Sequence, residues 1–171
     1  KKELIKLEDL LKVSYLKTGR LFEASAKTGA MLAKKSKEEI QSFGLLGKAL
    51  GIAFQIQDDI LDYEALKLDT GKPALKDFKE GKITFPLYFA LQDIDVKEKK
   101  FLLAKLGKQK ITSKDHNKIY QLIHNDKTQK HINALLDKYS NETLQHLNKL
   151  KHHACYNEML NLIGYSKVRK K

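Results

Sequence analysis

Helical spacing of apolar residues recurs along the chain, and no convincing pair of alternating strands is found. The most apolar stretch covers residues 45–56 and is apolar on nearly every side, which is typical of a helix buried in a protein core. We expect Gly44, Gly47 and Gly51 to let neighbouring helices approach it closely, although each costs about 1 kcal/mol in helical propensity relative to alanine. The pattern predicts an all-α protein.

Amphipathic stretches predict helices on both sides of the buried one. The predicted elements cover about residues 4–16, 19–34, 36–66, 84–91, 96–106, 113–124 and 126–153, with a last apolar patch at 159–163. Ser36 is expected to cap the long third helix, with Glu39 completing a capping box. Residues 67–81 contain two glycines and a proline, so we expect most of this segment to be an ordered loop.

Three carboxylates, those of Asp58, Asp59 and Asp62, follow the apolar stretch. If the helix continues to Tyr63, Asp58 and Asp62 share a face and Asp59 lies about 100° round the same turn. Carboxylates on a buried helix repel each other and lose hydration, so something cationic should compensate them. Oxygen ligands without a nearby Cys or His favour Mg²⁺ or Mn²⁺, and Mg²⁺ often fills its shell with water and substrate phosphates. The stretch therefore predicts a diphosphate site.

Length and composition indicate one soluble domain over residues 1–171, because 42% of the residues are hydrophobic, 32% are charged and no membrane-spanning stretch is visible. The single cysteine, Cys155, suits a reducing compartment, so a cytoplasmic protein is expected. The net charge of +12 comes almost entirely from lysine, since the arginines are Arg20 and Arg169. Without an arginine cluster, a solvated lysine surface is favoured over a nucleic-acid partner.

A zinc site is the second metal hypothesis, and its candidate ligands are His146, His152, His153 and Cys155. On one helix, His152 and His153 would point apart and His146 would lie almost two turns away. The predicted helix therefore argues against zinc.

Two runs of sequence resemble one enzyme family in their motifs and their order. The run G-I-A-F-Q-I-Q-D-D-I-L-D-Y (51–63), followed by T-G-K-P-A-L-K-D-F-K-E-G-K-I-T-F-P (70–86), closely resembles the second aspartate-rich region of trans-isoprenyl diphosphate synthases, the polyprenyl synthetases. Upstream, Y-L-K-T-G-R-L-F-E-A-S-A-K-T-G-A-M-L-A (15–33) resembles the family's Lys-Thr motif and the helix after it. The resemblance covers about residues 15–91, and linked motifs are far more specific than one aspartate motif alone.

The resemblance implies an isoprenoid-synthase-type bundle of long antiparallel helices around a central cavity. It also implies a Mg²⁺-assisted prenyltransferase, in which an allylic diphosphate ionises, the alkene of isopentenyl diphosphate attacks the carbocation, and a proton is lost. The run at residues 71–82 resembles the longer-chain branch, such as octaprenyl synthases, more than the farnesyl branch. A homodimer is expected, and the product could be delivered to a membrane.

By position, the resemblance implies three metal ligands, which are Asp58, Asp59 and Asp62. Lys17 and Thr18 match the catalytic Lys-Thr pair beside the allylic diphosphate and the carbocation. Gln55 matches a catalytic glutamine near the reacting carbon. Lys72 matches a loop lysine that contacts diphosphate, and Lys82 is expected to support it.

The chain departs from the family pattern in one large respect. No first DDxxD motif precedes Lys17, and the basic residues that bind isopentenyl diphosphate around that motif are missing as well. The chain therefore resembles the C-terminal half of a synthase, and we expect activity in the intact enzyme rather than in this half alone. Two alternatives stay open: a non-catalytic or diphosphate-binding subunit of the same fold, and a lysine-rich helical domain that binds anions.

Overall fold

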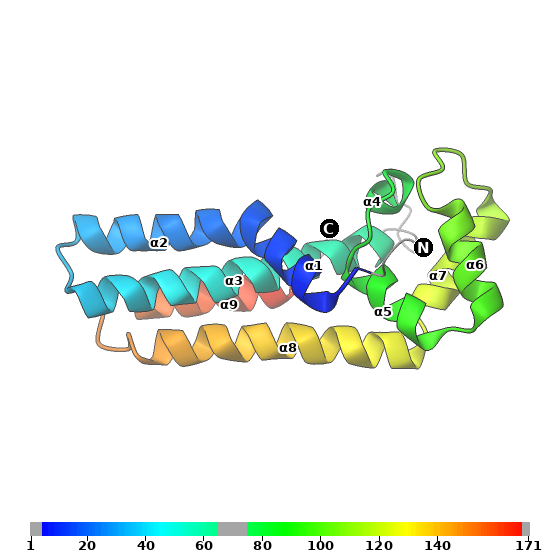
Figure 1. The fold of residues 1–171 in the computed structure, drawn as a ribbon. Coiled ribbons are helices and arrows are strands. Elements are labelled where there is room, and N and C mark those ends of the chain that lie inside the picture. Colours follow the sequence, from blue (N-terminus) through cyan, green and yellow to red (C-terminus); the bar gives the residue numbers. More distant parts are fainter. Residues whose placement is uncertain (1–4, 65–74, 169–171) are drawn as a thin grey trace. The chain divides into compact units, whose positions relative to one another are not determined.

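The computed structural model describes residues 5–64 and 75–168, and every regular element in these ranges is a helix (Figure 1). The elements are α1 (Leu7–Ser14), the π-helix η1 (Tyr15–Gly19), α2 (Arg20–Leu32), α3 (Lys37–Glu64), α4 (Lys76–Lys79), α5 (Phe85–Asp93), α6 (Val96–Lys105), α7 (Ser113–Ile123), α8 (Asp126–Asn148) and α9 (Tyr156–Val168). Within the described ranges, no helix is long and apolar enough to cross a bilayer. The all-α prediction is confirmed.

The chain divides into two compact units. The first comprises Lys1–Gln57 and Leu135–Lys170, and the second comprises Asp58–Ala134. The long helices α3 and α8 each begin in one unit and end in the other. The single domain expected over residues 1–171 stays a prediction.

The first unit is built around α3, which runs beside α2 and α9 (Figure 1). One of its hydrophobic clusters joins α3, α8 and α9, and its buried members are Leu46, Leu50, Leu147 and Ile163. Close backbone contact between helices depends on two glycines of α3. A Cβ atom at Gly51 would lie 2.6 Å from the Gly19 Cα, and one at Gly47 would lie 2.5 Å from the Phe22 carbonyl oxygen. Both positions confirm that the glycines allow close approach.

The Ser36–Glu39 capping box at the start of α3 is also confirmed. The Ser36 backbone N–H donates to Glu39 Oε2 at 2.9 Å, and the Glu39 N–H donates to Ser36 Oγ at 3.2 Å. These reciprocal bonds satisfy amide groups that have no acceptor within the first turn of the helix.

The second unit has its own hydrophobic core. Its buried members are Tyr63, Leu75, Phe78, Leu87, Ala90, Leu91, Leu102, Ile119, Leu122 and Ile123. Helix α5 begins where predicted, with Thr84 at the N-cap and Pro86 in the first turn, where the missing N–H is not needed. Asp95 and Thr112 cap α6 and α7 with their side chains.

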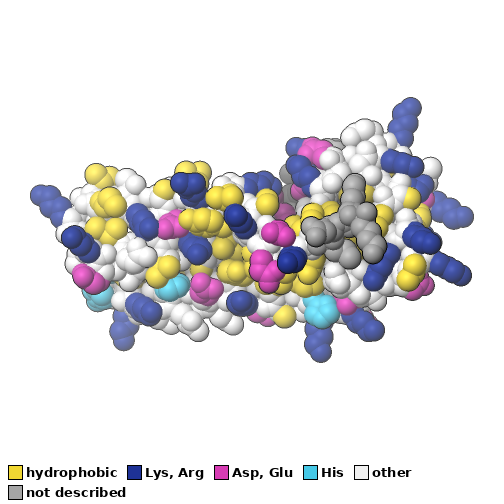
Figure 2. Space-filling model, in the orientation of Figure 1, with side chains coloured by type: hydrophobic (Ala, Val, Ile, Leu, Met, Phe, Trp, Pro, Cys, Tyr) yellow, Lys and Arg dark blue, Asp and Glu magenta, His cyan; other side chains and the backbone are white. Residues whose placement is uncertain are grey.

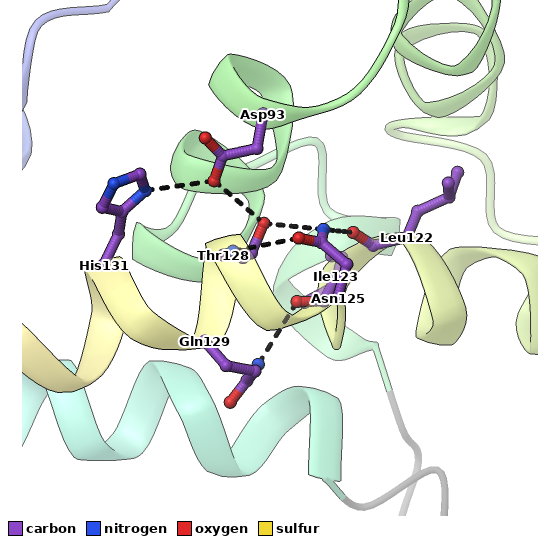
Figure 3. Close-up of polar contacts among 7 residues, drawn as sticks. All are labelled: Asp93, Leu122, Ile123, Asn125, Thr128, Gln129 and His131. Carbon is purple, nitrogen blue, oxygen red and sulfur yellow. Dashed lines mark hydrogen bonds and ion pairs between the residues drawn. The ribbon is translucent and has the colours of Figure 1, made fainter.

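Polar side chains join the start of α8 to the ends of α5 and α7 (Figure 3). Asn125 Oδ1 accepts a hydrogen bond from the Thr128 N–H at 3.0 Å, and Asn125 Nδ2 donates to the Leu122 carbonyl at 2.6 Å. Thr128 Oγ1 donates to Asp93 Oδ2 at 3.3 Å, and His131 Nδ1 lies 3.1 Å from the same oxygen. This junction gives Asp93 and His131 a structural role in holding three helices together.

The helix predicted over residues 126–153 ends earlier, at Asn148, so the prediction was wrong for its last residues. The Leu150 N–H donates to the Leu147 carbonyl at 2.8 Å, and the His153 N–H donates to the Leu150 carbonyl at 3.0 Å. Such i to i+3 bonds wind the chain into tight turns rather than an α-helix. Leu150 is buried in one hydrophobic cluster with Phe43, and this apolar contact stabilises the turn.

Candidate functional site

Thr18 and Gln55, two of the predicted catalytic residues, are hydrogen-bonded to each other. Thr18 Oγ1 donates to Gln55 Oε1 at 2.7 Å, which joins η1 to α3. The close backbone approach between Gly51 and Gly19 lies next to this bond, one residue after Thr18 and one helical turn before Gln55. Gln55 is 4% exposed, so the Thr18 hydroxyl holds a buried amide in one orientation.

Lys17 lies beside Thr18 in η1 and is exposed, whereas Gly19 at the end of η1 is buried. A π-turn is uncommon in helices and is frequently found at functional sites. Phe54, which was expected to pack rather than to react, has its ring centroid 5.6 Å from that of Phe22 on α2. Thr18 and Gln55 are therefore brought together, with Lys17 on the same helical turn as Thr18.

The three predicted metal ligands lie on the last two turns of α3, and their environments differ. Asp58 is partly exposed, whereas Asp59 and Asp62 are each 6% exposed. Asp62 Oδ1 accepts the Lys76 N–H at 3.3 Å, and its Oδ2 accepts the Asp77 N–H at 3.2 Å, so Asp62 caps the first turn of α4. Asp59 Oδ2 lies 3.5 Å from the N–H of Phe85, the first residue of α5.

Two of the three carboxylates thus lie at helix N-termini. Backbone N–H donors at a helix N-terminus stabilise a negative charge, and a helix of several turns adds the positive end of its dipole. The four-residue helix α4 acts on Asp62 through its N–H groups. The sequence led us to expect compensation from a cation. In the structure, backbone N–H groups of α4 and α5 provide part of that compensation around Asp62 and Asp59.

Tyr63 follows these carboxylates and is fully buried in the core of the second unit. Burial first, and then the negative charges of Asp62, Asp59 and Asp77, raise the pKa of its hydroxyl above the ordinary 10.0, although the Thr84 contact opposes the shift. Thr84 Oγ1 donates to the Tyr63 oxygen at 3.2 Å. The Tyr63 hydroxyl therefore stays protonated at neutral pH and cannot act as a base there.

Lys82, a predicted diphosphate-binding residue, is paired with carboxylates in the structure. Its Nζ lies 3.0 Å from Asp77 Oδ1 and also pairs with Glu80. Hydrogen bonds to Glu80 and Asp77 raise the pKa of the Lys82 ammonium, so it stays charged. Because the Asp77 N–H binds Asp62, α4 connects Lys82 to the aspartate motif. Lys72, the other predicted loop lysine, lies outside the described residues.

Asp77 is the member of this network that the sequence analysis missed. The sequence does contain one weak signal, which is Gly81. In the structure this glycine adopts a positive φ of 78°, and the turn that it forms returns Lys82 towards Asp77. A glycine four residues after an aspartate is too common to identify such a pair from sequence.

The aspartate set matches the donor chemistry of a hard divalent cation. Asp58, Asp59 and Asp62 offer carboxylate oxygens alone, which suit Mg²⁺. A carboxylate has about four acceptor positions, so accepting backbone N–H groups does not by itself prevent metal binding. The residues therefore fit the predicted ion, and their role as its ligands stays a prediction.

Lysine side chains are spread over the face of the molecule shown in Figure 2. Some lysines in the described part of the chain are paired with acids or aromatic rings. Lys105 Nζ lies 2.7 Å from Asp115 Oδ2, and Lys48 Nζ lies 5.2 Å from the ring centroid of Tyr15. The solvated lysine surface expected from the sequence stays a prediction.

Known proteins provide an independent comparison. The family model described as polyprenyl synthetase matches residues 1–123. The short chain isoprenyl diphosphate synthase of Methanocaldococcus jannaschii is 35% identical over 117 residues, which cover 68% of this chain and 36% of that protein. The octaprenyl diphosphate synthase of Escherichia coli is 44% identical over 84 residues, which cover 49% of this chain and 26% of that protein.

Solved structures share the fold over almost the whole chain. A decaprenyl diphosphate synthase from Rhodobacter capsulatus has a TM-score of 0.84 at 29% identity, covering 98% of this chain and 53% of that one. A polyprenyl synthase from Caulobacter crescentus, complexed with calcium and isoprenyl diphosphate, has a TM-score of 0.86 at 26% identity. The match covers 98% of this chain and 51% of that one. The chain thus spans about half the length of these structures and a smaller share of the curated relatives. With a family model matched over residues 1–123, this chain belongs to the polyprenyl synthetase family.

Proposed function

We propose that this chain supplies the second diphosphate-binding half of a prenyltransferase that condenses isopentenyl diphosphate with an allylic diphosphate. The observation that carries the proposal is the carboxylate set on the last turns of α3, with two of its members held at the N-termini of α4 and α5. When bound, Mg²⁺ would neutralise the charge of the departing diphosphate. The calcium and isoprenyl diphosphate bound to the Caulobacter crescentus protein support a divalent ion in this fold.

The chain's own residues would take distinct parts in this reaction. Asp58, the most exposed of the three aspartates, would be the first metal ligand, and the capping bonds would keep Asp62 in a fixed orientation. Lys17, exposed on η1, would hold the allylic diphosphate by its charge. The bond from Thr18 would orient Gln55 near the reacting carbon.

Two finer features belong to the same proposal. Lys72 and Lys82 would contact the diphosphate, although Lys82 would have to exchange its contacts with Asp77 and Glu80 for the substrate. The product would be a long polyprenyl diphosphate such as octaprenyl, because the run at residues 71–82 resembles that branch, and the enzyme would be a homodimer. Sizing the products, and light scattering on the purified enzyme, test these two points.

The exposed apolar face of α2 supports the proposal that a further part of the synthase fold packs against this chain. Between Leu21 and Leu32, none of the exposed positions of α2 carries a charged side chain, in a protein with 32% charged residues. Leu21 is 71% exposed, Met31 56% and Leu32 79%, and apolar side chains are visible over α2 in Figure 2. An exposed apolar surface of this kind marks an interaction site. The occupant would be the part of the fold that the relatives contain beyond the half matched here.

The test uses the full-length protein with Mg²⁺, isopentenyl diphosphate and farnesyl diphosphate. Asp58→Ala should lower kcat about a thousandfold or more, because losing a metal ligand removes several kcal/mol of transition-state stabilisation. Asp137→Ala, which removes an exposed carboxylate from α8, is the matched control and should leave kcat unchanged. Near-normal turnover of Asp58→Ala would show that the site is misplaced. Absence of any condensation product from the wild-type protein would favour the non-catalytic subunit.

A further inference from the structure

A second cluster of metal-ligating side chains lies in the first unit and consists of Glu39, His152 and His153. One ligand atom from each residue lies within 4.8 Å of the other two. Glu39 Oε1 is 2.9 Å from His153 Nε2 and 3.5 Å from His152 Nε2. Both imidazoles therefore converge on one Glu39 oxygen, and none of the three predicted aspartate ligands belongs to this cluster.

The fold creates this cluster from two distant segments. Glu39 lies in the first turn of α3, and both histidines lie in the turns that follow the end of α8. On a continued α8 helix, His152 and His153 would point apart, which is why the sequence argued against zinc. Because α8 ends at Asn148, adjacent residues present their imidazoles to the same carboxylate, with ring centroids 4.2 Å apart.

The ligand groups are held by their surroundings. The Ser36 N–H donates to Glu39 Oε2, which leaves Oε1 directed at the imidazoles. The His153 ring lies 5.3 Å from the Phe43 ring, and its side chain is 6% exposed. A bond from a neighbouring group to a ligand, like the Ser36 bond, fixes the orientation of metal ligands in known sites.

The contact geometry differs from that of a simple ion pair. His153 Nε2 is buried and has no hydrogen bond of acceptable geometry, although Glu39 Oε1 is only 2.9 Å away. A hydrogen bond needs the N–H to point at the oxygen. Metal ligands instead point at a third position, and bonds of about 2.0–2.2 Å in a tetrahedral site separate ligand atoms by roughly 3.3 Å. The separations of 2.9 and 3.5 Å lie on either side of that value.

We propose that Glu39, His152 and His153 bind a divalent transition-metal ion of the Zn²⁺ class. Two imidazoles and one carboxylate suit Zn²⁺, Co²⁺ or Ni²⁺, whereas Mg²⁺ prefers oxygen ligands. The His152 side chain is 63% exposed, so water can complete the coordination. The ion would join the start of α3 to the turns after α8, and it would be separate from the ions expected at Asp58, Asp59 and Asp62.

The test titrates the purified chain with Co²⁺, a coloured probe for Zn²⁺ sites, in excess Mg²⁺ to occupy oxygen-only sites. We expect one Co²⁺ per chain, with the visible absorption of a low-coordinate nitrogen and oxygen site, and displacement by Zn²⁺. His152→Ala and Glu39→Gln should each weaken binding at least about tenfold. Glutamine also serves in a capping box, so Glu39→Gln removes the charged ligand while keeping the cap. His152 is exposed, so its replacement should not unfold the protein.

His116→Ala, which removes an imidazole in α7, and Asp137→Asn, which removes an exposed carboxylate charge from α8, are the matched controls and should bind Co²⁺ as the wild type does. Zn²⁺ should also raise the melting temperature of the wild type but not of His152→Ala, because a ligand that binds only the folded state stabilises it. No Co²⁺ absorption in the wild type would overturn the proposal, and so would unchanged affinity in both His152→Ala and Glu39→Gln.

Discussion

Replacing Gly51 with alanine tests how the backbone contact between η1 and α3 positions Gln55. The added Cβ would lie 2.6 Å from the Gly19 Cα and 3.1 Å from the Phe22 Cβ. The nearer contact involves backbone, so the two segments must separate. Alanine gains about 1 kcal/mol in helical propensity, but overpacking costs typically about 1–3 kcal/mol and more where backbone must move. We expect Gly51→Ala to destabilise the chain by about 1–2 kcal/mol.

Gly29→Ala is the matched control, because it makes the same chemical change inside α2. A Cβ at Gly29 would meet nothing within 4 Å, so the propensity gain should appear alone and stabilise the chain by about 0.5–1 kcal/mol. Urea unfolding followed by far-UV circular dichroism measures both changes. Opposite signs support the reasoning. If Gly51→Ala is as stable as the wild type or more so, the close packing has been misjudged.

Separating η1 from α3 should also weaken the bond between Thr18 and Gln55, since Gln55 lies one turn beyond Gly51. If the full-length protein is the proposed prenyltransferase, Gly51→Ala should lower its kcat more than Gly29→Ala does, even at a temperature where both variants are folded. Equal kcat values for Gly51→Ala and Gly29→Ala would show that the packing of η1 against α3 does not affect catalysis.

Two further outcomes are expected. Asp62→Asn should destabilise the chain by about 1–3 kcal/mol, because the amide nitrogen would face an N–H at the start of α4. Asp58→Asn should change stability less. Equal effects of the two variants in urea unfolding would contradict the capping role of Asp62. Leu21→Glu and Leu32→Glu should stay within about 0.5 kcal/mol of the wild type in this chain, but cost about 1.5–3 kcal/mol each in the full-length protein, where their face of α2 would be covered. Equal melting temperatures for variants and wild type in the full-length protein would leave that face without a partner.

Local chemistry predicted much of the fold. The Ser36 cap and the Thr84 and Pro86 start of α5 depend on residues near in sequence, so their patterns could be interpreted correctly. The glycines of α3 could be recognised as positions of close approach, but their partners, Gly19 and Phe22, could not. The end of α8 could not, because the turns at Leu150 are stabilised by burial against Phe43, more than 100 residues earlier in the chain. Periodicity carries no information about such distant contacts.

The same limit applies to the candidate site. The aspartates could be proposed as ligands because family motifs are contiguous in sequence, whereas the capping of α4 by Asp62 depends on contacts made after residue 74. The pairing of Glu39 with His153 spans even more of the chain. Side-chain type therefore suggests the chemistry of individual residues, whereas their partners became known only from the fold.

The π-turn η1 also determines how the helices before and after it are aligned. An α-helix advances by about 100° per residue, and a π-turn inserts one extra residue. Leu16 and Leu21 are five residues apart in the sequence, but the extra residue places them as if they were four apart on an α-helix. As a result, one stripe contains four exposed apolar residues: Val13, Leu16, Leu21 and Leu32. Deleting one residue of η1 would preserve both helices but turn the faces of α1 by about 100° relative to those of α2 and break the stripe. An alignment of relatives that treats residues 7–32 as one α-helix would therefore compare the wrong faces on one side of Tyr15.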